Sequence, residues 1–431
     1  MIPKRDIVIL FVVTILSLGT ALSLRSTSQT GTSLLVETLV DKQSLRFDAV
    51  QEITVDRDNQ TFVFSLIDGS WNQVTPFPQT MDPSSMTALI ESVQGLQVLG
   101  TLTKDTSDDV LGLDAESNYI ELFDGIDRVR VILGRKTLGG RGYAKLQKGE
   151  PVLVGQSLHR RAIDMDHRLW RDVRLFPDFA IDGELIERDV QGDRLVLKRI
   201  QGRWEMLEPV PARLNQDMLT EWVGKLAAAR VGMYVIDEPT NLTPFGLEVP
   251  AATFATTTGN VVKRTLLIGG RVAAGSQDRY VMFDGSPVVF RMTMDALNQL
   301  FPVPEMFVDS TGSSVSKFDV KQVIIRTGGK EIQVTRNLDR WVGENDIPVD
   351  SAEINSLLHW ILEGNPVSVA ISPFPLNLEI ATVTLVGYDL SPLDTVRIAL
   401  DESEQWILEN GDNVLRLHPS ESGKALAPFQ N

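Results

Sequence analysis

The chain has 431 residues, 43% of them hydrophobic, and a formal net charge of −16 at pH 7. This length exceeds one ordinary domain, and the apolar content argues against intrinsic disorder. The negative charge disfavours nucleic-acid binding, and the absence of cysteine excludes disulfides, thiolate metal sites and a cysteine nucleophile.

The first predicted element is an uncharged apolar segment over 7–24, with the sequence IVILFVVTILSLGTALSL. As an α-helix it would extend about 27 Å, close to the hydrocarbon thickness of a bilayer. Lys4 and Arg5 precede it and only Arg25 follows closely, so we expect the N-terminus in the cytoplasm and the bulk outside. We interpret 1–24 as a membrane anchor and 25–44 as a linker.

A cleaved signal peptide is the alternative for the N-terminal segment. Ala21-Leu22-Ser23 has small residues at the two positions that a signal peptidase reads. The apolar segment is longer than the usual signal core of about 7–15 residues, which favours the anchor. Both interpretations place the bulk of the chain outside the cytoplasm.

An internal repeat follows the linker. Three tryptophans lie 133 and 137 residues apart, and a phenylalanine precedes each by 24, 25 or 23 residues. The pairs are Phe47 and Trp71, Phe179 and Trp204, and Phe318 and Trp341. Three matching offsets predict three copies of one folding unit, which we place at 45–178, 179–312 and 313–431.

Each copy predicts the same local structure. Short β-branched runs separated by polar or glycine turns, such as 53–55 and 61–65 around 56–60, indicate strand hairpins. An amphipathic helix follows each tryptophan, and capping side chains predict its start at Asp82-Pro83, at Asn215, and at Asp350 or Ser351. Apolar residues at helical spacing give each helix one buried stripe: Met86, Leu89, Ile90, Val93 and Leu96; Leu219, Trp222, Val223 and Leu226; Ile354, Leu357, Leu358 and Ile361.

Glycine landmarks continue the repeat in the first two copies. Leu111-Gly112-Leu113-Asp114 matches Phe245-Gly246-Leu247-Glu248, and Leu133-Gly134-Arg135 matches Ile268-Gly269-Gly270. The third copy lacks these glycines, keeps strands at 381–386, 396–400 and 406–408, and is predicted to be a shortened terminal cap. The expected fold class is α+β: a transmembrane helix, then three tandem β-rich repeats with hairpins, one amphipathic helix and further antiparallel strands.

These features in this order resemble a bacterial family of unknown function, the DUF4340 domain. They are the N-terminal span, a hairpin ending in Gly-x-Trp, a proline loop, the amphipathic helix, a Gly-Leu-acidic segment, and a Leu-Gly or Ile-Gly strand end before Tyr143 or Tyr280. The resemblance covers 45–310 most fully. It implies an exported protein associated with gliding-motility-type ABC transporters, as a partner of the permease and of a large auxiliary subunit.

The sequence predicts no catalytic, cofactor-binding or metal-binding residue. His159, His167, His359 and His418 have no metal-type spacing, and we interpret them as packing or surface residues. Gly139-Gly140-Arg141-Gly142 lacks the spacing of a phosphate loop, and 56–59 lacks the glycine and distal glutamate of a calcium loop, so both are read as strand turns. The repeated tryptophans are interpreted as packing anchors, with ligand stacking as the alternative.

The expected function is therefore a non-catalytic, membrane-anchored accessory subunit of an ABC-transporter or gliding-motility-type complex. It would act through protein–protein contacts, single-pass in the bacterial inner membrane with a periplasmic bulk. The alternative is an exported binding module for polysaccharide, cell wall or another ligand, because tandem repeats make extended surfaces suited to either role.

Overall fold

The structure is a computed structural model of the chain. It describes residues 37–41, 43–102, 106–114, 118–177, 179–259, 262–344, 347, 349–372 and 379–430. The predicted span 7–24 and most of the predicted linker lie outside the described residues. Within the described ranges, no helix is both long and apolar enough to cross a membrane.

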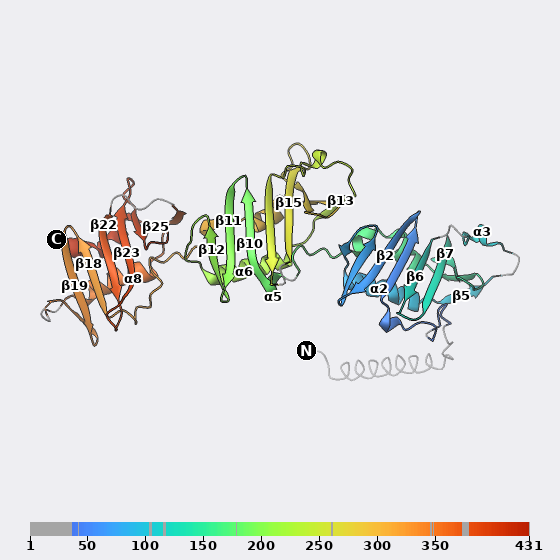
Figure 1. The fold of residues 1–431 in the computed structure, drawn as a ribbon, viewed down its shortest axis with the longest axis horizontal. Helices are drawn as coiled ribbons and strands as arrows, with labels where there is room; N and C mark the ends of the chain where they lie inside the picture. The colour runs from blue at the N-terminus through green and yellow to red at the C-terminus, as the bar shows by residue number, and fades with distance from the viewer. Residues whose placement is uncertain are drawn as a thin grey trace, which may run out of the picture. The chain divides into compact units, whose positions relative to one another are not determined.

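Three antiparallel sheets make up the described part of the chain (Figure 1). The strand order is β4-β3-β2-β1-β6-β7-β8-β9-β5 in the first sheet, β12-β11-β10-β14-β15-β16-β17-β13 in the middle sheet and β20-β19-β18-β22-β23-β24-β25-β21 in the third. Apart from the added edge strand β4, the three orders are the same. Three antiparallel sheets together with helices confirm the predicted α+β class for the described part of the chain.

The first sheet lies in a compact unit that covers Met1–Asp172. Its strands are β1 (Glu52–Arg57), β2 (Gln60–Ile67), β3 (Ser70–Thr75), β4 (Gln79–Thr80), β5 (Val98–Thr101), β6 (Tyr119–Phe123), β7 (Arg128–Thr137), β8 (Arg141–Leu146) and β9 (Val152–Gly155). Its helical segments are η2 (Phe47–Ala49), α2 (Pro83–Gln94), α3 (Asp108–Leu111), α4 (Ser157–His159), η3 (Arg160–Asp164) and η4 (His167–Trp170).

The middle and third sheets lie in a second compact unit, Val173–Asn431. The middle sheet contains β10 (Gly183–Val190), β11 (Asp193–Ile200), β12 (Arg203–Glu208), β13 (Met233–Asp237), β14 (Ala252–Thr258), β15 (Lys263–Arg271), β16 (Arg279–Phe283) and β17 (Val288–Met292). Its helical segments are α5 (Phe179–Asp182), α6 (Gln216–Ala228), η5 (Thr243–Phe245), α7 (Met294–Leu300) and η6 (Pro304–Phe307).

The third sheet completes the second unit. Its strands are β18 (Gln322–Thr327), β19 (Lys330–Asn337), β20 (Arg340–Val342), β21 (Ser368–Ile371), β22 (Glu379–Val386), β23 (Pro392–Leu400), β24 (Trp406–Glu409) and β25 (Val414–His418). Its helical segments are α8 (Ser351–Glu363), η8 (Ser420–Ala425) and α9 (Ala427–Gln430).

Tight hairpins connect the first three main strands of every sheet. Each has two central residues, the first with positive φ: Asp58, Asp68, Gln191, Gln201, Gly328 and Leu338. In all but the last, the second central residue also has positive φ, as type I′ turns require. The backbone twist of a type I′ turn matches the right-handed twist of the flanking strands. The turn sequences therefore fix the register of the first three main strands in each sheet. The predicted turns within 56–60, 139–142 and 328–329 are confirmed.

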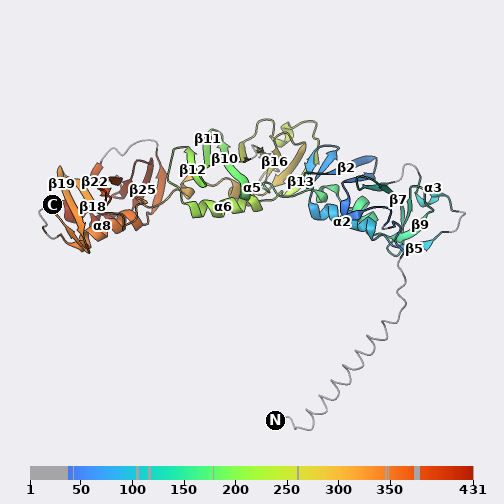
Figure 2. The ribbon, with the colours of Figure 1, turned by 60° about the horizontal axis from the view of Figure 1, so that its bottom comes forward.

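One long helix covers one face of each sheet (Figure 2). Asp82, Asn215 and Asp350 are the N-caps of α2, α6 and α8, and each side chain accepts hydrogen bonds from backbone amides of the first turn. The predicted helix starts are therefore confirmed. The helix stripes pack into the sheet cores together with Trp71, Trp204 and Trp341, which are all buried.

The middle and third sheets form one unit because a buried polar junction connects them. The Arg416 side chain is fully buried; its Nε donates to the Asp309 carbonyl (3.0 Å) and its Nη2 contacts Asp412 (2.6 Å). Arg213 forms an ion pair with Asp309 at 3.0 Å. Val414 of β25 packs within the core of the middle sheet. Charge and apolar burial together hold these two sheets against each other.

Two features differ from the sequence expectations. Glu37 to Val40, placed in the linker, pair with Leu96 and Val98, and Val40 is fully buried in the first core. The third copy was expected to be shortened, but its sheet has the same eight strand positions as the middle sheet. The third copy has fewer residues because its connections are shorter. The segment between β21 and β22 is much shorter than the segment between β13 and β14, and it does not contain the Gly-Leu landmark.

Candidate functional site

The recurring glycines of the first two copies form one packed contact. Gly246 has φ +62°, and the loop that contains it lies directly on β15. A Cβ on Gly269 would lie closer than 3.0 Å to the Phe245 carbonyl and to the Leu247 side chain. The pairing of β15 with β16 has a register irregularity at the same place, between Ile268 and Arg271. The Gly269 carbonyl is then available for a side-chain donor.

Different side chains donate a hydrogen bond to the equivalent glycine carbonyl in the two copies, Gly134 in the first and Gly269 in the second. In the first sheet, His159 Nε2 lies 3.1 Å from the Gly134 carbonyl, and burial lowers the pKa of this histidine, so the neutral ring donates the bond. In the middle sheet, Arg279 Nη1 donates to the Gly269 carbonyl at 3.0 Å. The middle sheet therefore holds a guanidinium where the first sheet holds a neutral imidazole.

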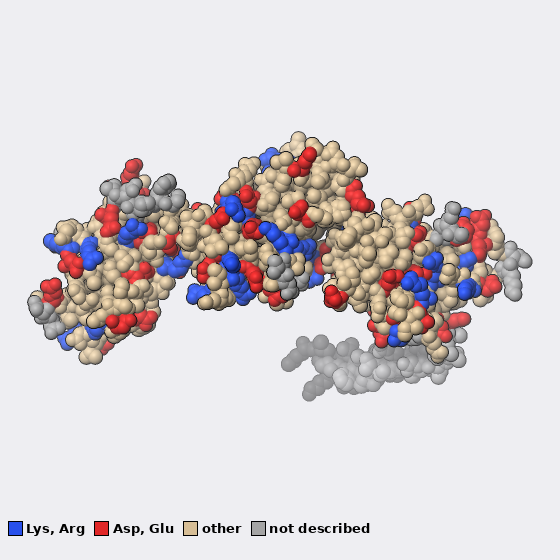
Figure 3. All heavy atoms as spheres, viewed as in Figure 1, with Lys and Arg blue, Asp and Glu red and all other residues tan. Residues whose placement is uncertain are grey.

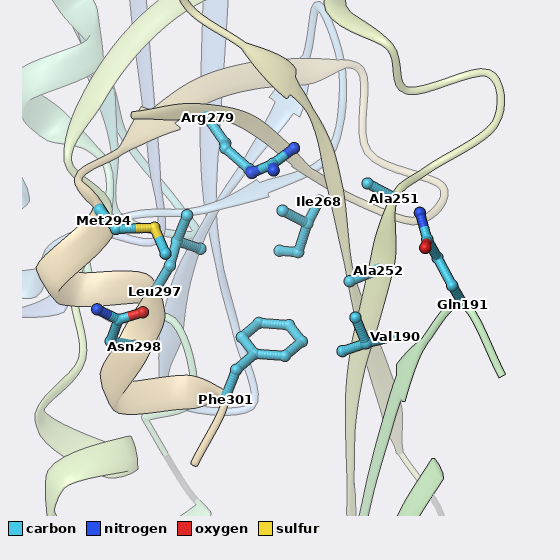
Figure 4. A pocket seen from close by; sticks show the side chains of 10 residues that line it. All are labelled: Val190, Gln191, Ala251, Ala252, Ile268, Arg279, Met294, Leu297, Asn298 and Phe301. Atoms are coloured by element: carbon cyan, nitrogen blue, oxygen red, sulfur yellow. The ribbon is translucent and has the colours of Figure 1, made fainter. Parts of the chain in front are cut away.

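Arg279 lies at one end of a pocket of about 260 Å³ between α7 and the strands β10, β14 and β15 (Figure 4). The other lining residues are mostly apolar, with two amides at the rim: Val190, Gln191, Ala251, Ala252, Ile268, Met294, Leu297, Asn298 and Phe301. Such a mixture, apolar walls with a few polar groups, is typical of binding pockets.

The walls of the pocket are held by the core beneath them. Leu297 and Ile268 belong to the buried cluster of the middle sheet. The Phe301 ring packs against Phe254, with ring centroids 5.8 Å apart. Buried Arg188 donates to the Pro302 carbonyl at 2.8 Å and forms an ion pair with Asp193 at 2.5 Å. These contacts fasten the segment after α7 to β10, so the pocket is pre-formed.

The chemistry of the pocket follows from these groups. Arg279 makes a carbonyl hydrogen bond, and within the described ranges no carboxylate forms an ion pair with it. An arginine presents five N–H donors, so this guanidinium can still bind an anion or a carbonyl oxygen. The volume is near the lower end of ligand pockets, which are roughly 300–1,000 Å³. The pocket suits an apolar group of side-chain size next to an acidic or carbonyl group.

The histidines and the glycine-rich segment considered in the sequence analysis lie in the core, on the surface or at a strand connection. The histidines His159 and His418 are buried, His167 packs on Phe62 with centroids 4.7 Å apart, and His359 pairs with Glu363 on the surface of α8. In the segment 139–142, Gly139 and Gly140 lie in the turn between β7 and β8, and Arg141 and Gly142 begin β8. Within the ranges that the structure describes, no group of three or more histidine, aspartate or glutamate side chains could hold a metal ion.

Sequence reasoning did not find the pocket. Its lining comes from separate segments at 190–191, 251–252, 268, 279 and 294–301, which only folding brings together. One signal was available. Gly142-Tyr143 of the first copy matches Arg279-Tyr280 of the second, and an arginine at the position of a glycine indicates a local difference between the copies.

The fold and the pocket define an α+β protein of repeated antiparallel sheets with a small apolar recess. Residues 204–369 match the model of a family described as "Domain of unknown function (DUF4340)". The match runs from β12 to β21 and confirms the predicted resemblance, over a range nearer the C-terminus than the expected 45–310. Comparison with curated proteins finds no match, and comparison with solved structures finds none.

Proposed function

We propose that this protein is a non-catalytic, exported accessory subunit of an ABC-transporter or gliding-motility-type complex, anchored by a transmembrane helix over 7–24. The bulk of the chain, with its three tandem repeats, lies in the periplasm and contacts a permease and a large exported auxiliary subunit. The uncharged N-terminal segment, its flanking Lys4 and Arg5, and the DUF4340 match support this proposal.

The pocket of the middle sheet carries the proposal. Protein interfaces obtain most of their binding energy from a few anchor side chains that fill pre-formed pockets. A recess of about 260 Å³ with apolar walls and one guanidinium suits an aliphatic or aromatic anchor beside an acidic residue of a partner. In this proposal Arg279 binds the acidic residue of the partner, and Leu297 and Phe301 contact its apolar anchor side chain.

The sheet faces opposite the helices offer further contact surface. Figure 3 shows basic and acidic side chains interspersed on the displayed face. In the first sheet, Arg128 and Arg130 both pair with Glu121 at 2.7 Å. The two guanidinium carbons also lie 4.5 and 4.1 Å from the rings of Phe123 and Tyr119. Side chains held in this way lose little conformational freedom on binding, which favours a protein interface.

A matched pair of variants tests the proposal. Asn298 is exposed on α7 and lines the pocket, so Asn298→Trp should fill the recess with little change to the core. Gln299 is the next residue, is exposed and does not line the pocket, so Gln299→Trp is the control. The full-length chain, tagged at its C-terminus, would be purified with partners from native membranes in a mild detergent.

The wild-type chain and Gln299→Trp should recover the permease and the large exported subunit, whereas Asn298→Trp should recover much less of both. If the two variants recovered equal amounts of the permease and the large exported subunit, the pocket would not be part of the interface. Recovery of no membrane partner by the wild-type chain, with the span intact, would contradict the accessory-subunit proposal itself and favour a ligand-binding module.

A further inference from the structure

Each repeated tryptophan has a directly opposed residue across its hairpin. The pairs are Leu66 with Trp71, Arg199 with Trp204, and Arg336 with Trp341. Directly opposed residues of an antiparallel pair project from the same face of the sheet. The first copy therefore has leucine at a position where the other two have arginine.

In the third sheet, this arginine covers its tryptophan. The guanidinium carbon of Arg336 lies 5.1 Å from the ring centroid of Trp341, within cation–π range. Arg336 Nη1 also donates to the Lys317 carbonyl at 3.2 Å. The chain thus provides its own cation for the tryptophan of the third copy.

In the middle sheet, an aromatic ring packs beside the tryptophan. Phe179 of α5 is buried, and its ring lies 6.1 Å from that of Trp204. The segment α5 packs against α6, the long helix of the same sheet. The second and third tryptophans are therefore both covered from within the chain.

The first sheet leaves this space open. A cavity of about 400 Å³ lies beside Trp71, between η2, the end of β2 and the helix α2. Its lining is aromatic and aliphatic on one side and polar at the rim: Phe47, Asp48, Val50, Leu66, Trp71, Thr87, Ile90, Glu91 and Gln94.

The rim of this cavity carries uncompensated negative charge. Asp48 and Glu91 are exposed, and neither carboxylate has an ion pair or side-chain hydrogen bond to any residue that the structure describes. The lining contains no lysine or arginine. The nearby Arg46 is committed to Asp124, with Nε 3.1 Å from the carboxylate. Two carboxylates beside an indole and a phenyl ring favour a cationic occupant.

We propose that this cavity binds the basic side chain of a partner polypeptide, so that the partner supplies to Trp71 the cation that Arg336 supplies internally to Trp341. The occupant is a guanidinium or ammonium group whose charge faces Asp48 and Glu91 and whose alkyl stem lies along Leu66 and Ile90. The inference concerns the first sheet alone and does not depend on the pocket beside Arg279.

A capped amino acid tests the site directly. The full-length chain in detergent, labelled with 5-fluorotryptophan, would be titrated with N-acetyl-arginine amide and followed by ¹⁹F NMR. A Trp71→Phe variant assigns the Trp71 resonance. The neutral isostere N-acetyl-citrulline amide is the chemical control, and free arginine, whose own carboxylate would meet the two rim acids, separates a polypeptide site from a free amino acid site.

We expect the Trp71 resonance to move saturably with the capped arginine and to respond on the order of tenfold more weakly to the citrulline compound. Leu66→Arg should abolish the response, because it installs the internal cation of the third sheet. Asp48→Asn with Glu91→Gln should weaken binding by a similar factor. Asp58→Asn with Glu150→Gln, which removes two exposed acids outside the lining, should leave it unchanged.

An unresponsive Trp71 resonance, or an equal response to the citrulline compound, would overturn the proposal. Tighter binding of free arginine than of the capped form would replace the polypeptide by a small-molecule ligand. None of these outcomes bears on recovery of a membrane complex, so failure here is distinguishable from failure of the proposed function.

Discussion

Replacing Trp204 by alanine tests whether the repeated tryptophans act as core anchors. The indole is 7% exposed and packs within the core of the middle sheet, next to Phe179. The backbone of Trp204 is held separately: its N–H donates to Gln216 Oε1 at 3.0 Å, and Gln216 Nε2 donates to its carbonyl at 2.9 Å. Because alanine keeps these two hydrogen bonds, the substitution removes the indole packing and little else.

The magnitude follows from the large-to-small cost of a buried tryptophan, about 3–5 kcal/mol. The unit that contains it spans Val173–Asn431, so its unfolding entropy near 60 °C is on the order of 0.5 kcal/mol per kelvin. We therefore expect the melting temperature of this unit to fall by about 6–9 °C in scanning calorimetry.

Leu207→Ala is the matched control for this prediction. Leu207 lies on the same strand β12 but is 42% exposed, so its truncation should change the free energy of unfolding by less than about 0.5 kcal/mol. A Trp204→Ala chain that melts with the wild type, or no lower than Leu207→Ala, would refute the anchor interpretation and favour a ligand-stacking role for the indole.

Three further predictions concern stability. Gly134→Ala should destabilise the first unit by roughly 1–3 kcal/mol, because the new Cβ would meet the Leu111 carbonyl, whereas Gly155→Ala, with open space, should be near neutral in the same calorimetric scan. Burial and the neighbouring Arg416 lower the pKa of His418 to about 4 from its ordinary 6.5, so the unfolded state takes up the proton first. The second unit should therefore lose stability as the pH falls from about 6.5 to about 4, and His418→Gln should remove that part of the pH dependence of its melting temperature. The backbone amides of Asp127, Arg46 and Ile126 hold the pKa of Asp124 well below its usual range, so this carboxylate stabilises the first unit at neutral pH. Asp124→Asn should lower the melting temperature at pH 7, and the gap to the wild type should narrow below about pH 4; a constant gap would contradict this reasoning.

Local structure was predictable because its causes are local. The hairpin turns depend on residues that tolerate positive φ, such as Asn59, Gly69 and Gly202, and these are visible in the sequence. The helix starts depend on a capping side chain within three residues, as at Asp82 and Asn215. Both signals operate over a few residues, so no knowledge of the tertiary fold was needed.

The reason for the glycine landmarks was not predictable. The sequence indicates that Gly246 and Gly269 recur with Gly112 and Gly134, but not that each pair lies at one loop-to-strand contact. The partners are some 20 residues apart, and the constraint is a steric one between backbone and side-chain atoms that only the folded chain brings together.

Both cavities likewise required the tertiary structure. The pocket beside Arg279 collects residues from four strands, three connections and one helix. The cavity beside Trp71 is lined by Leu66, at the position from which Arg336 reaches over Trp341 in the third sheet. The difference between leucine in the first copy and arginine in the other two acquires a functional meaning only when the cross-strand pairing is known.

The sequence by itself determined the number of β-rich copies and the resemblance to DUF4340, because landmarks that recur at fixed offsets are visible without a structure. It also determined the hairpins and the helix caps, because turn chemistry and capping act between near neighbours. The tertiary structure decided which strands meet at each sheet edge, that the third copy has a complete sheet, and where the copies leave space uncovered. Those outcomes depend on contacts between residues far apart in the chain. These contacts stabilise the fold through close packing and through buried hydrogen bonds and ion pairs, and a local sequence pattern does not predict which residues form them.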